Sequence, residues 1–372
     1  MLAAGTGASA SNAAFGIGLP VLAPALRESH GLSLGEIGLL FAAEWTGSLL
    51  TLFAWGLLTD RFGERRVLVL GLGLCGVFLI AAAETSGFAG LALLVGLASA
   101  TGGSVNSASG RAVMHWFGRE ERGLALGIRQ TAIPAGGLVA AVVLPMLDVE
   151  SAFRFLGGFC LLGALAGAVF LREGPDDVAE AELTAPWTLH DSRIWLLCGA
   201  SGLYLVAQVA LIGFVVLFLH DERGFSTGEA AAVLAAVQVG AAVLRIGAGR
   251  WSDIVRSRAT PLRLIGLGTC GALAVATALL YGPTVVLVPA LVVAGALSMA
   301  WNGLSFTAAA ELAGRARSGA AIGVQQSGLA LAGAIVPVAF AAMVSSTSWR
   351  AAYALAAAGP LLGALVLRPL RV

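Results

Sequence analysis

Twelve apolar segments, each long enough to cross a lipid bilayer, follow one another along this chain. A helix that spans the hydrocarbon core needs about 20 predominantly apolar residues, and charged or turn-rich stretches separate the segments. They cover residues 1–25, 34–58, 67–83, 87–112, 122–146, 152–171, 194–219, 226–249, 263–281, 284–310, 318–344 and 349–367. The pattern predicts an all-α membrane protein with twelve transmembrane helices, because hydrocarbon leaves the backbone no hydrogen-bonding partners outside a helix or a closed barrel.

The composition excludes several other classes of protein. Of the 372 residues, 58% are hydrophobic and only 12% are charged, whereas a soluble domain has about 25% charged residues. An ordinary soluble enzyme and a disordered chain are therefore excluded. The net charge of +1 excludes a nucleic-acid binder driven by bulk charge. The four cysteines lie singly in different apolar segments, so they form no disulfide framework and no metal-binding spacing.

The only long polar stretch divides the chain into two halves. We predict an N-terminal six-helix half over residues 1–171, a cytoplasmic linker over 172–192 and a C-terminal six-helix half over 193–372. With a cytoplasmic N-terminus, 16 of the 22 basic residues, all of them arginines, fall on the cytoplasmic side and four fall outside. Because cytoplasmic loops carry an excess of Arg and Lys, we expect both termini in the cytoplasm and the protein in the inner (plasma) membrane.

The two halves repeat each other. The segment 123–131 matches 319–327 at a spacing of 196 residues, and the same spacing pairs Asn106 with Asn302. A slightly shorter spacing, 193 residues, pairs Asp60 with Asp253. A parallel duplication of six-helix halves is a transporter architecture, in which the substrate path lies between the halves.

The loop after the second segment carries the most specific motif. Residues 56–66 read Gly-Leu-Leu-Thr-Asp-Arg-Phe-Gly-Glu-Arg-Arg. The loop resembles the signature of the major facilitator superfamily, Gly-x-Leu-x-Asp-Arg-x-Gly-x-Arg-Arg, at the place where that family has it. A weaker copy at 249–253 includes Arg250 and Asp253. The resemblance covers essentially the whole chain and implies a twelve-helix secondary transporter.

The resemblance also implies roles for the loop residues. In the family, the motif aspartate contacts the start of helix 11 and holds the cytoplasmic gate closed, so Asp60 would face Ser318 and Gly319. Asp253 would correspondingly face the start of helix 5 near Gly123. A carboxylate is stabilised at a helix N-terminus by the unpaired N–H groups and the helix dipole.

Two glycines and three arginines complete this gating motif. Gly56 is expected to allow close approach of helix ends, and Gly63 to form a tight turn with positive φ. Arg61, Arg65 and Arg66 have two open interpretations, as members of the gate or as charges that fix the topology.

Polar side chains at mid-membrane depth are the candidates for binding substrate. An ionisable group in the membrane is costly and indicates function, while amides there also hydrogen-bond between helices. Both interpretations stay open for these residues. The candidates are Arg129, Gln130, Asn106, Gln208, Gln238, Trp301, Asn302, Gln325 and Gln326, and Asn12 lies at a similar depth.

Two further charged residues, Glu44 and Arg245, are candidates for coupling or charge balance. Glu44 could pair with an arginine such as Arg129, carry a coupling proton or form a structural hydrogen bond. Arg245 lies near the cytoplasmic end of its helix, where a structural or gating role is as plausible as substrate contact.

These features predict a secondary active transporter that moves a small solute by alternating access. Arg129-Gln130-Thr131 resembles carriers of small organic or inorganic anions, such as the cyanate-permease-like and monocarboxylate-like branches. The alternatives are a drug/proton efflux antiporter, whose helix-4 arginine is missing from residues 97–103, and a non-transporting membrane sensor on the same fold. No catalytic, metal or cofactor residues are apparent, so we expect no enzyme. The expected partners are a small molecule, the lipid bilayer and a coupling proton or other ion, with no nucleic acid, for a chain that acts as a monomer.

Overall fold

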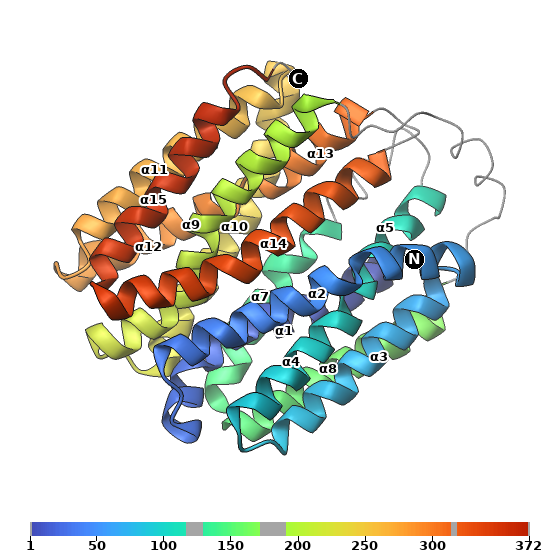
Figure 1. Ribbon diagram of the computed structural model, residues 1–372, viewed down its shortest axis with the longest axis horizontal. Coiled ribbons are helices and arrows are strands. Elements are labelled where there is room, and N and C mark those ends of the chain that lie inside the picture. The colour runs from blue at the N-terminus through green and yellow to red at the C-terminus, as the bar shows by residue number, and fades with distance from the viewer. Residues whose placement is uncertain (1, 117–128, 172–190, 314–317, 371–372) are drawn as a thin grey trace. The chain divides into compact units, whose positions relative to one another are not determined.

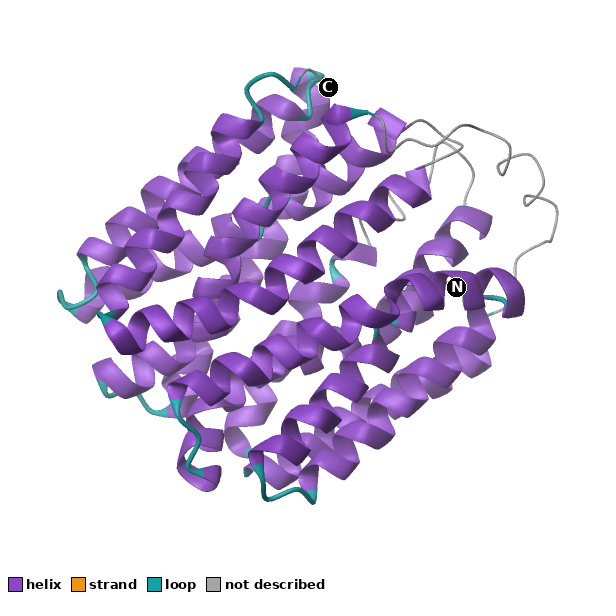
Figure 2. Ribbon diagram, in the orientation of Figure 1, coloured by secondary structure: helices purple, strands orange, loops and turns teal. Residues whose placement is uncertain are grey.

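A computed structural model describes residues 2–116, 129–171, 191–313 and 318–370 of the chain. The described residues form helices joined by short loops and turns, with no strand among them (Figure 2). This arrangement satisfies backbone hydrogen bonds within each segment, as a chain in hydrocarbon requires.

The helices follow one another in the order that the sequence predicts (Figure 1). Those before residue 171 are α1 (Leu2–His30), α2 (Leu34–Phe62), α3 (Glu64–Ala83), α4 (Phe88–Gly102), α5 (Ser104–Trp116), α7 (Ala132–Val143), the short 3₁₀ helix η1 (Leu144–Met146) and α8 (Val149–Phe170). The later helices are α9 (Ser192–Arg223), α10 (Thr227–Val255), α11 (Ala259–Ala278), α12 (Thr284–Ser298), α13 (Asn302–Ala313), α14 (Ser318–Ser346) and α15 (Trp349–Val366).

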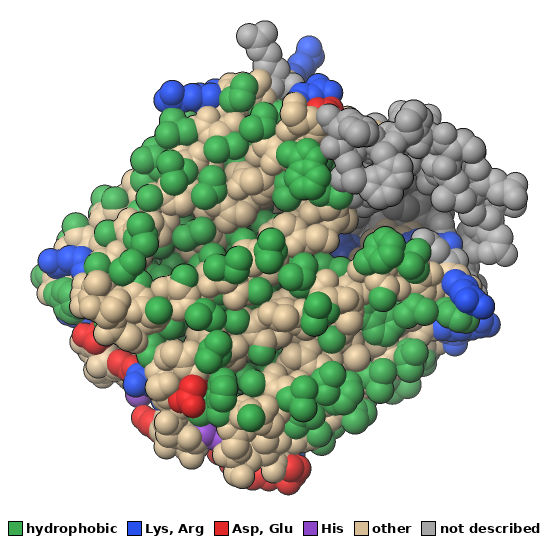
Figure 3. All heavy atoms as spheres, in the orientation of Figure 1, with side chains coloured by type: hydrophobic (Ala, Val, Ile, Leu, Met, Phe, Trp, Pro, Cys, Tyr) green, Lys and Arg blue, Asp and Glu red, His purple; other side chains and the backbone are tan. Residues whose placement is uncertain are grey.

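Eleven spans of the described residues are long and apolar enough to cross a membrane. A shorter apolar helical stretch, Ala132–Met146, is the described part of the predicted segment 122–146. On the face shown in Figure 3, hydrophobic side chains cover the middle of the helices and charged side chains lie near their ends. The predicted fold class, an all-α membrane protein, is confirmed.

The chain forms two compact units. The first comprises Met1–Val178 with Phe225–Ala232, and the second comprises Ala179–Gly224 with Val233–Val372. Most of the predicted linker, residues 172–190, lies outside the described residues.

In the first unit, close glycine contacts let helices pack tightly. α3 packs against α8, α2 against α4, and α1 against α7 and α8. A Cβ atom on Gly157 of α8 would lie 2.6 Å from the carbonyl oxygen of Gly76 on α3. Small residues at helix interfaces are typical of membrane proteins, where van der Waals packing drives helix association.

In the second unit, α9 packs against α14 and α15, and α11 against α15. Aromatic rings fill one region of this unit: the ring centroids of Phe218 and Trp349 are 5.4 Å apart, and those of Phe340 and Tyr353 are 5.1 Å apart. These rings bury a large apolar area and fix how α9, α14 and α15 pack.

Matching caps at the starts of α2 and α10 extend the internal repeat. Ser33 and Glu36 form a capping box at α2, in which each side chain bonds the other residue's backbone N–H. Ser226 and Glu229 form the same reciprocal bonds at α10. The two pairs are 193 residues apart, the spacing that also relates Asp60 to Asp253.

Two of the predicted segments are interrupted at equivalent places. Segment 87–112 breaks at Gly103 between α4 and α5, and segment 284–310 breaks at Met299–Trp301 between α12 and α13, 196 residues later. The last carbonyls of a helix lack intrahelical donors. At the first break, Ala100 O accepts hydrogen bonds from Thr51 Oγ1 (2.7 Å) and Trp55 Nε1 (2.6 Å) on α2.

The second break is satisfied in the same manner by α10. Arg245 Nε donates to Met299 O at 2.9 Å. Side chains from the equivalent helices α2 and α10 therefore donate hydrogen bonds to a backbone carbonyl oxygen at each break. Buried backbone within a membrane requires such partners.

Candidate functional site

Arg129 is anchored by polar atoms of α5. It lies just before the turn at Thr131 that precedes α7. Its Nε donates to Ser109 Oγ at 2.8 Å, and its Nη2 donates to Asn106 O at 3.1 Å and Asn106 Oδ1 at 3.3 Å. Asn106 and Ser109 are three residues apart on α5 and share a face of that helix. Arg129 and Asn106 are among the residues that the sequence predicts, whereas Ser109 is not.

The hydroxyl of Ser109 is oriented to accept from the guanidinium. Its Oγ donates its single hydrogen to Val105 O at 2.5 Å, so its lone pairs are left for Arg129. Ser9 of α1 also lies within hydrogen-bonding distance, with its Oγ 3.4 Å from Ser109 Oγ. The guanidinium is thus fixed by neutral acceptors on two of its three nitrogens.

Among the residues that the structure describes, Arg129 forms no ion pair with a carboxylate, and its Nη1 makes no hydrogen bond. The side chain is half-buried, and Asn106 beside it is exposed. A guanidinium at membrane depth without a counter-charge is costly. The geometry leaves one nitrogen, with two N–H groups, available to an anion.

The second unit repeats this arrangement with an amide. Gln325 is 1% exposed, and its Nε2 donates to Ser201 Oγ on α9 at 2.9 Å and to Ser305 Oγ on α13. The two serine hydroxyls also bond each other at 2.7 Å. Gln325 and Ser305 are the repeat equivalents of Arg129 and Ser109, so the same interaction occurs in both units with a neutral side chain in one and a cation in the other.

The remaining predicted binding residues lie at various degrees of burial. Gln238 is fully buried, and neither end of its amide has a described partner. Gln208 Oε1 is likewise buried without a described partner. Gln130 and Gln326 are half-buried. Trp301 is 1% exposed, and its ring contacts Tyr204 with centroids 5.8 Å apart, so it packs inside its unit and does not face lipid.

Glu44 forms no hydrogen bond or ion pair with any described residue. Its Oε1 lies 3.1 Å from the position that a Cβ on Gly16 of α1 would take. It is also near enough to Cys75 on α3 to interact electrostatically. Two of the three roles considered for Glu44, pairing with Arg129 and forming a structural hydrogen bond, are therefore not seen among the described residues. Arg245 binds the helix-break carbonyl of Met299, which is a structural contact.

Part of the signature loop is visible in the structure. Gly63 has φ of 83°, the left-handed region that the expected turn needs. The guanidinium of Arg61 lies over the ring of Phe62 at 5.3 Å, and Arg65 and Arg66 are exposed. Within the described residues, a Cβ on Gly56 would meet no atom within 4 Å, so the close approach expected at that glycine is not seen there.

The gating contacts expected for the two aspartates involve parts of the chain outside the described residues: the side chains of Asp60, Ser318 and Gly319, and residues 117–128. Asp253 is instead seen in an ion pair with Arg258 (2.6 Å), which also pairs with Glu311 of α13 (2.9 Å). Arg250 is exposed.

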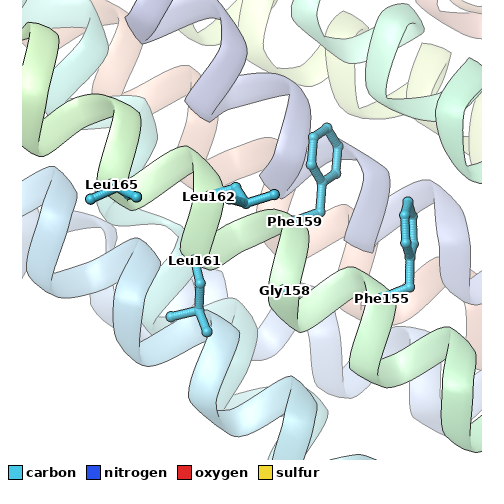
Figure 4. Close-up of a pocket in the computed structure, with 6 residues that line it drawn as sticks. All are labelled: Phe155, Gly158, Phe159, Leu161, Leu162 and Leu165. Carbon is cyan, nitrogen blue, oxygen red and sulfur yellow. The ribbon is translucent and has the colours of Figure 1, made fainter.

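An apolar hollow on α8 does not contribute to the candidate site. It has a volume of about 480 Å³ and is lined by Phe155, Gly158, Phe159, Leu161, Leu162 and Leu165, all from one helix (Figure 4). The rings of Phe155 and Phe159 stack with centroids 6.0 Å apart. With no polar group in its lining, this surface suits lipid chains better than a polar solute.

Apolar spanning helices and an internal repeat together define a multi-pass membrane protein of the transporter class. The chain belongs to the Major Facilitator Superfamily, whose family model matches residues 4–337.

Known relatives agree with this assignment. An uncharacterized MFS-type transporter of Mycobacterium tuberculosis is 33% identical, over 98% of this chain and 83% of that protein. A probable sulfoacetate transporter of Cupriavidus necator is 26% identical, over 89% of this chain and 84% of that protein. The crystal structure of a D-xylose-proton symporter matches the fold with a TM-score of 0.78 at 16% identity, covering 97% of this chain and 96% of that one.

Proposed function

We propose that this protein is a secondary active transporter that moves a small organic anion across the plasma membrane by alternating access. Arg129 is the group that binds the anion. The observation that carries the proposal is that Ser109 and Asn106 hold its guanidinium while no described carboxylate neutralises it. A charge of this kind is compensated most simply by a transported anion.

The relatives support the charge of the substrate. The Cupriavidus necator relative is named a probable sulfoacetate transporter, and sulfoacetate is a small organic anion. The repeat supports the same conclusion, because Gln325 stands at the equivalent place and the duplicated scaffold therefore does not need a cation there.

Glu44 is the proposed carrier of a coupling proton. A membrane carboxyl group without a hydrogen-bonding or ionic partner is much less costly when it is neutral. Among the titratable side chains described on α1, α3, α4 and α5, Cys75 is the one that interacts with Glu44. We expect Glu44→Gln to retain exchange of anion but to lose accumulation driven by a pH gradient.

The proposal is tested with Arg129→Gln in purified protein. Thermal unfolding is measured with and without small organic anions, sulfoacetate among them, because a ligand stabilises the state that it binds. Gln is chosen because Gln325 already bonds Ser305 at the equivalent position, so the variant is expected to fold. Arg154→Gln serves as the control, since Arg154 is half-exposed and pairs with Glu84 and Glu150.

We expect the wild type and the control to be stabilised by an anion, and Arg129→Gln to show no stabilisation. Unchanged stabilisation of Arg129→Gln would overturn the anion role. Stabilisation by lipophilic cations alone would support the drug/proton antiporter instead, and binding without solute flux in proteoliposomes would support a sensor.

The proposed topology places both termini and the linker 172–192 in the cytoplasm. In a variant whose native cysteines are replaced, a cysteine at Asp177 should react with an impermeant reagent only after the cells are permeabilised. Reaction in sealed cells would contradict the orientation.

A further inference from the structure

The guanidinium of Arg129 offers an anion only one of its three nitrogens. Nε and Nη2 form the edge that usually binds a carboxylate through two parallel hydrogen bonds. Here Ser109 Oγ accepts from Nε, and two oxygens of Asn106 accept from Nη2, which uses both hydrogens of that nitrogen. Nη1 is left, so Arg129 by itself holds one oxygen of an anion and leaves the others without a donor.

Asn106 carries a second donor beside this nitrogen. A guanidinium donates hydrogen bonds and accepts none, so the Asn106 side chain faces it with Oδ1, and this contact fixes the orientation of the amide. The other branch of the amide, Nδ2, has no hydrogen-bond partner among the described residues. Because the Asn106 side chain is exposed, its two remaining N–H groups are accessible to a ligand.

The two unused nitrogens are close enough for one anionic group to reach both. Arg129 Nη1 and Asn106 Nδ2 each share a carbon with one atom of the 3.3 Å contact between Nη2 and Oδ1. With bonds of about 1.3 Å within each planar group, Nη1 and Nδ2 are at most about 8 Å apart. A carboxylate that accepts a hydrogen bond of about 2.9 Å at each oxygen bridges nitrogens up to about 8 Å apart.

The chemistry of these two nitrogens selects the ligand. Both only donate, so the group bound between them must accept hydrogen bonds at more than one atom. An ionised carboxylate or sulfonate does so, and its charge matches that of Arg129. An uncharged carboxamide would instead direct hydrogens of its own at these donors.

We propose that Asn106 determines specificity for an oxyanion: Nδ2 donates to a second oxygen of the group whose first oxygen Arg129 Nη1 binds. The substrate is therefore an ionised carboxylate or sulfonate, held between two side chains of the first compact unit. This inference rests on the proposed function for the role of Arg129. It adds a requirement that the arginine alone does not impose, which is a second accepting oxygen.

The repeat shows that an asparagine here is not needed merely to hold the neighbouring donor. Asn302 is the repeat equivalent of Asn106, and Gln325 is the equivalent of Arg129. Gln325 donates to Ser201 and Ser305, while Asn302 Oδ1 has no described partner. Asn302 is also buried, at 8% exposed, whereas Asn106 is exposed. The exposed amide in contact with its donor is thus found in the unit that has the cation.

The test uses the small number of asparagines in the chain. There are three, Asn12, Asn106 and Asn302, so labelling the asparagine side chains with ¹⁵N gives three amide signals in the NMR spectrum of the purified full-length protein. The signal of Asn106 is assigned by its absence from Asn106→Leu. Hexanoate and hexane-1-sulfonate are the probes, and their affinities are measured in parallel by calorimetry.

We expect either probe to shift the amide protons of Asn106 downfield, and to move the signals of Asn12 and Asn302 much less. Asn106→Leu should bind both probes about tenfold more weakly, in line with a lost hydrogen bond to a charged group. Ser109→Ala is the matched control, because it removes an anchor of the guanidinium but no donor to the ligand. At saturation it should still show the downfield shift of Asn106. Arg154→Gln should bind as the wild type does.

Amide protons of Asn106 that do not move at saturation would show that this residue only holds Arg129, and would overturn the inference. Wild-type affinity of Asn106→Leu would overturn it as well.

Failure of the proposed function has a different result. If Arg129→Gln binds both probes as the wild type does, the anion role of Arg129 is wrong. If Arg129→Gln loses both probes while the Asn106 signal of the wild type does not respond to them, the anion role stands and the role of Asn106 is wrong. Absence of wild-type binding to hexanoate, hexane-1-sulfonate and sulfoacetate alike would contradict both.

Discussion

Arg129 donates from Nε to the hydroxyl oxygen of Ser109, 2.8 Å away, and Gln325 donates to Ser305 at the equivalent place 196 residues later. The duplication has kept the serine acceptor and varied its donor. In the first unit the donor is a permanent cation, and in the second it is a neutral amide. The same contact thus holds a charged side chain in one unit and an uncharged one in the other.

Ser109→Ala is expected to weaken anion binding about fivefold to thirtyfold without abolishing it. The variant removes one of the two anchors of the guanidinium, a charge-assisted hydrogen bond of about 1–2 kcal/mol, and leaves Asn106 in place. Affinity for hexanoate, measured by calorimetry, checks this, with Ser305→Ala as the matched control in the other unit. Equal affinities of wild type and Ser109→Ala would show that Ser109 does not position Arg129.

Removing both donors to Ala100 O should destabilise the first helix break more than removing either. Thr51→Val and Trp55→Phe each leave the carbonyl one donor, so each should lower the free energy of unfolding by about 1 kcal/mol or less. The double variant leaves a carbonyl unsatisfied within the membrane and should lose about 2–3 kcal/mol, more than the sum of the single losses. Thermal unfolding in detergent provides the comparison. Simple additivity would indicate that another group satisfies Ala100 O.

Alanine substitutions at two adjacent glycines of α8 should change the stability of the protein in opposite directions. A Cβ on Gly157 would lie 2.6 Å from both Gly76 O and Ile80 Cγ1 of α3, so Gly157→Ala should destabilise the protein by about 1–3 kcal/mol. A Cβ on Gly158 would meet nothing within 4 Å, so Gly158→Ala should stabilise the helix by about 0.5–1 kcal/mol. The two melting temperatures should fall on opposite sides of the wild-type value. If they shift together, the close approach of α3 and α8 is not as described.

The cap of α8 predicts a defined response to acid. The pKa of Asp148 lies below its ordinary value chiefly because the backbone N–H of Ser151 donates to its carboxylate. A carboxyl group whose pKa is lower in the folded state stabilises that state above its unfolded pKa of about 3.9 and loses this contribution as the pH falls through the folded pKa.

Asp148→Asn keeps a good N-cap residue but removes the charge. At about pH 6 the wild type should therefore melt at a higher temperature than the variant, and the difference should disappear towards about pH 2–3. Melting curves across this range check the expectation, and a difference that did not change with pH would contradict it.

The sequence predicts the number and order of the spanning segments well because apolarity over about 20 residues is a strong local signal. Each of the predicted segments 87–112 and 284–310 forms one span, Phe88–Ala112 and Thr284–Ala313, but the sequence did not predict the helix break within it. At the first break, Gly102-Gly103 is a local signal that could have suggested one. At the second, Met299-Ala300-Trp301 carries no helix-breaking residue, so only the repeat spacing could have transferred the break from one half to the other.

The candidate site was predicted in part for a similar reason. A charge in an apolar segment is conspicuous, so Arg129 was identified, and the repeat spacing drew attention to Asn106 and Gln325. Ser109, Ser201 and Ser305 are small and common in membrane helices, and their importance comes from which helices lie side by side. The 196-residue spacing of Ser109 and Ser305 was the one available signal for them.

The helix breaks have a consequence for how the chain enters the membrane during synthesis. The two interrupted spans, Phe88–Ala112 and Thr284–Ala313, have 25 and 30 residues, so each is long enough to cross a hydrocarbon core about 30 Å thick. Each nevertheless enters the bilayer with a carbonyl at its break that side chains of another helix bond. The donors lie on α2 and α10, which precede α4 and α12 in the chain and leave the ribosome first. In each half, the nascent chain has already made the side chains that the interrupted span requires by the time that span emerges.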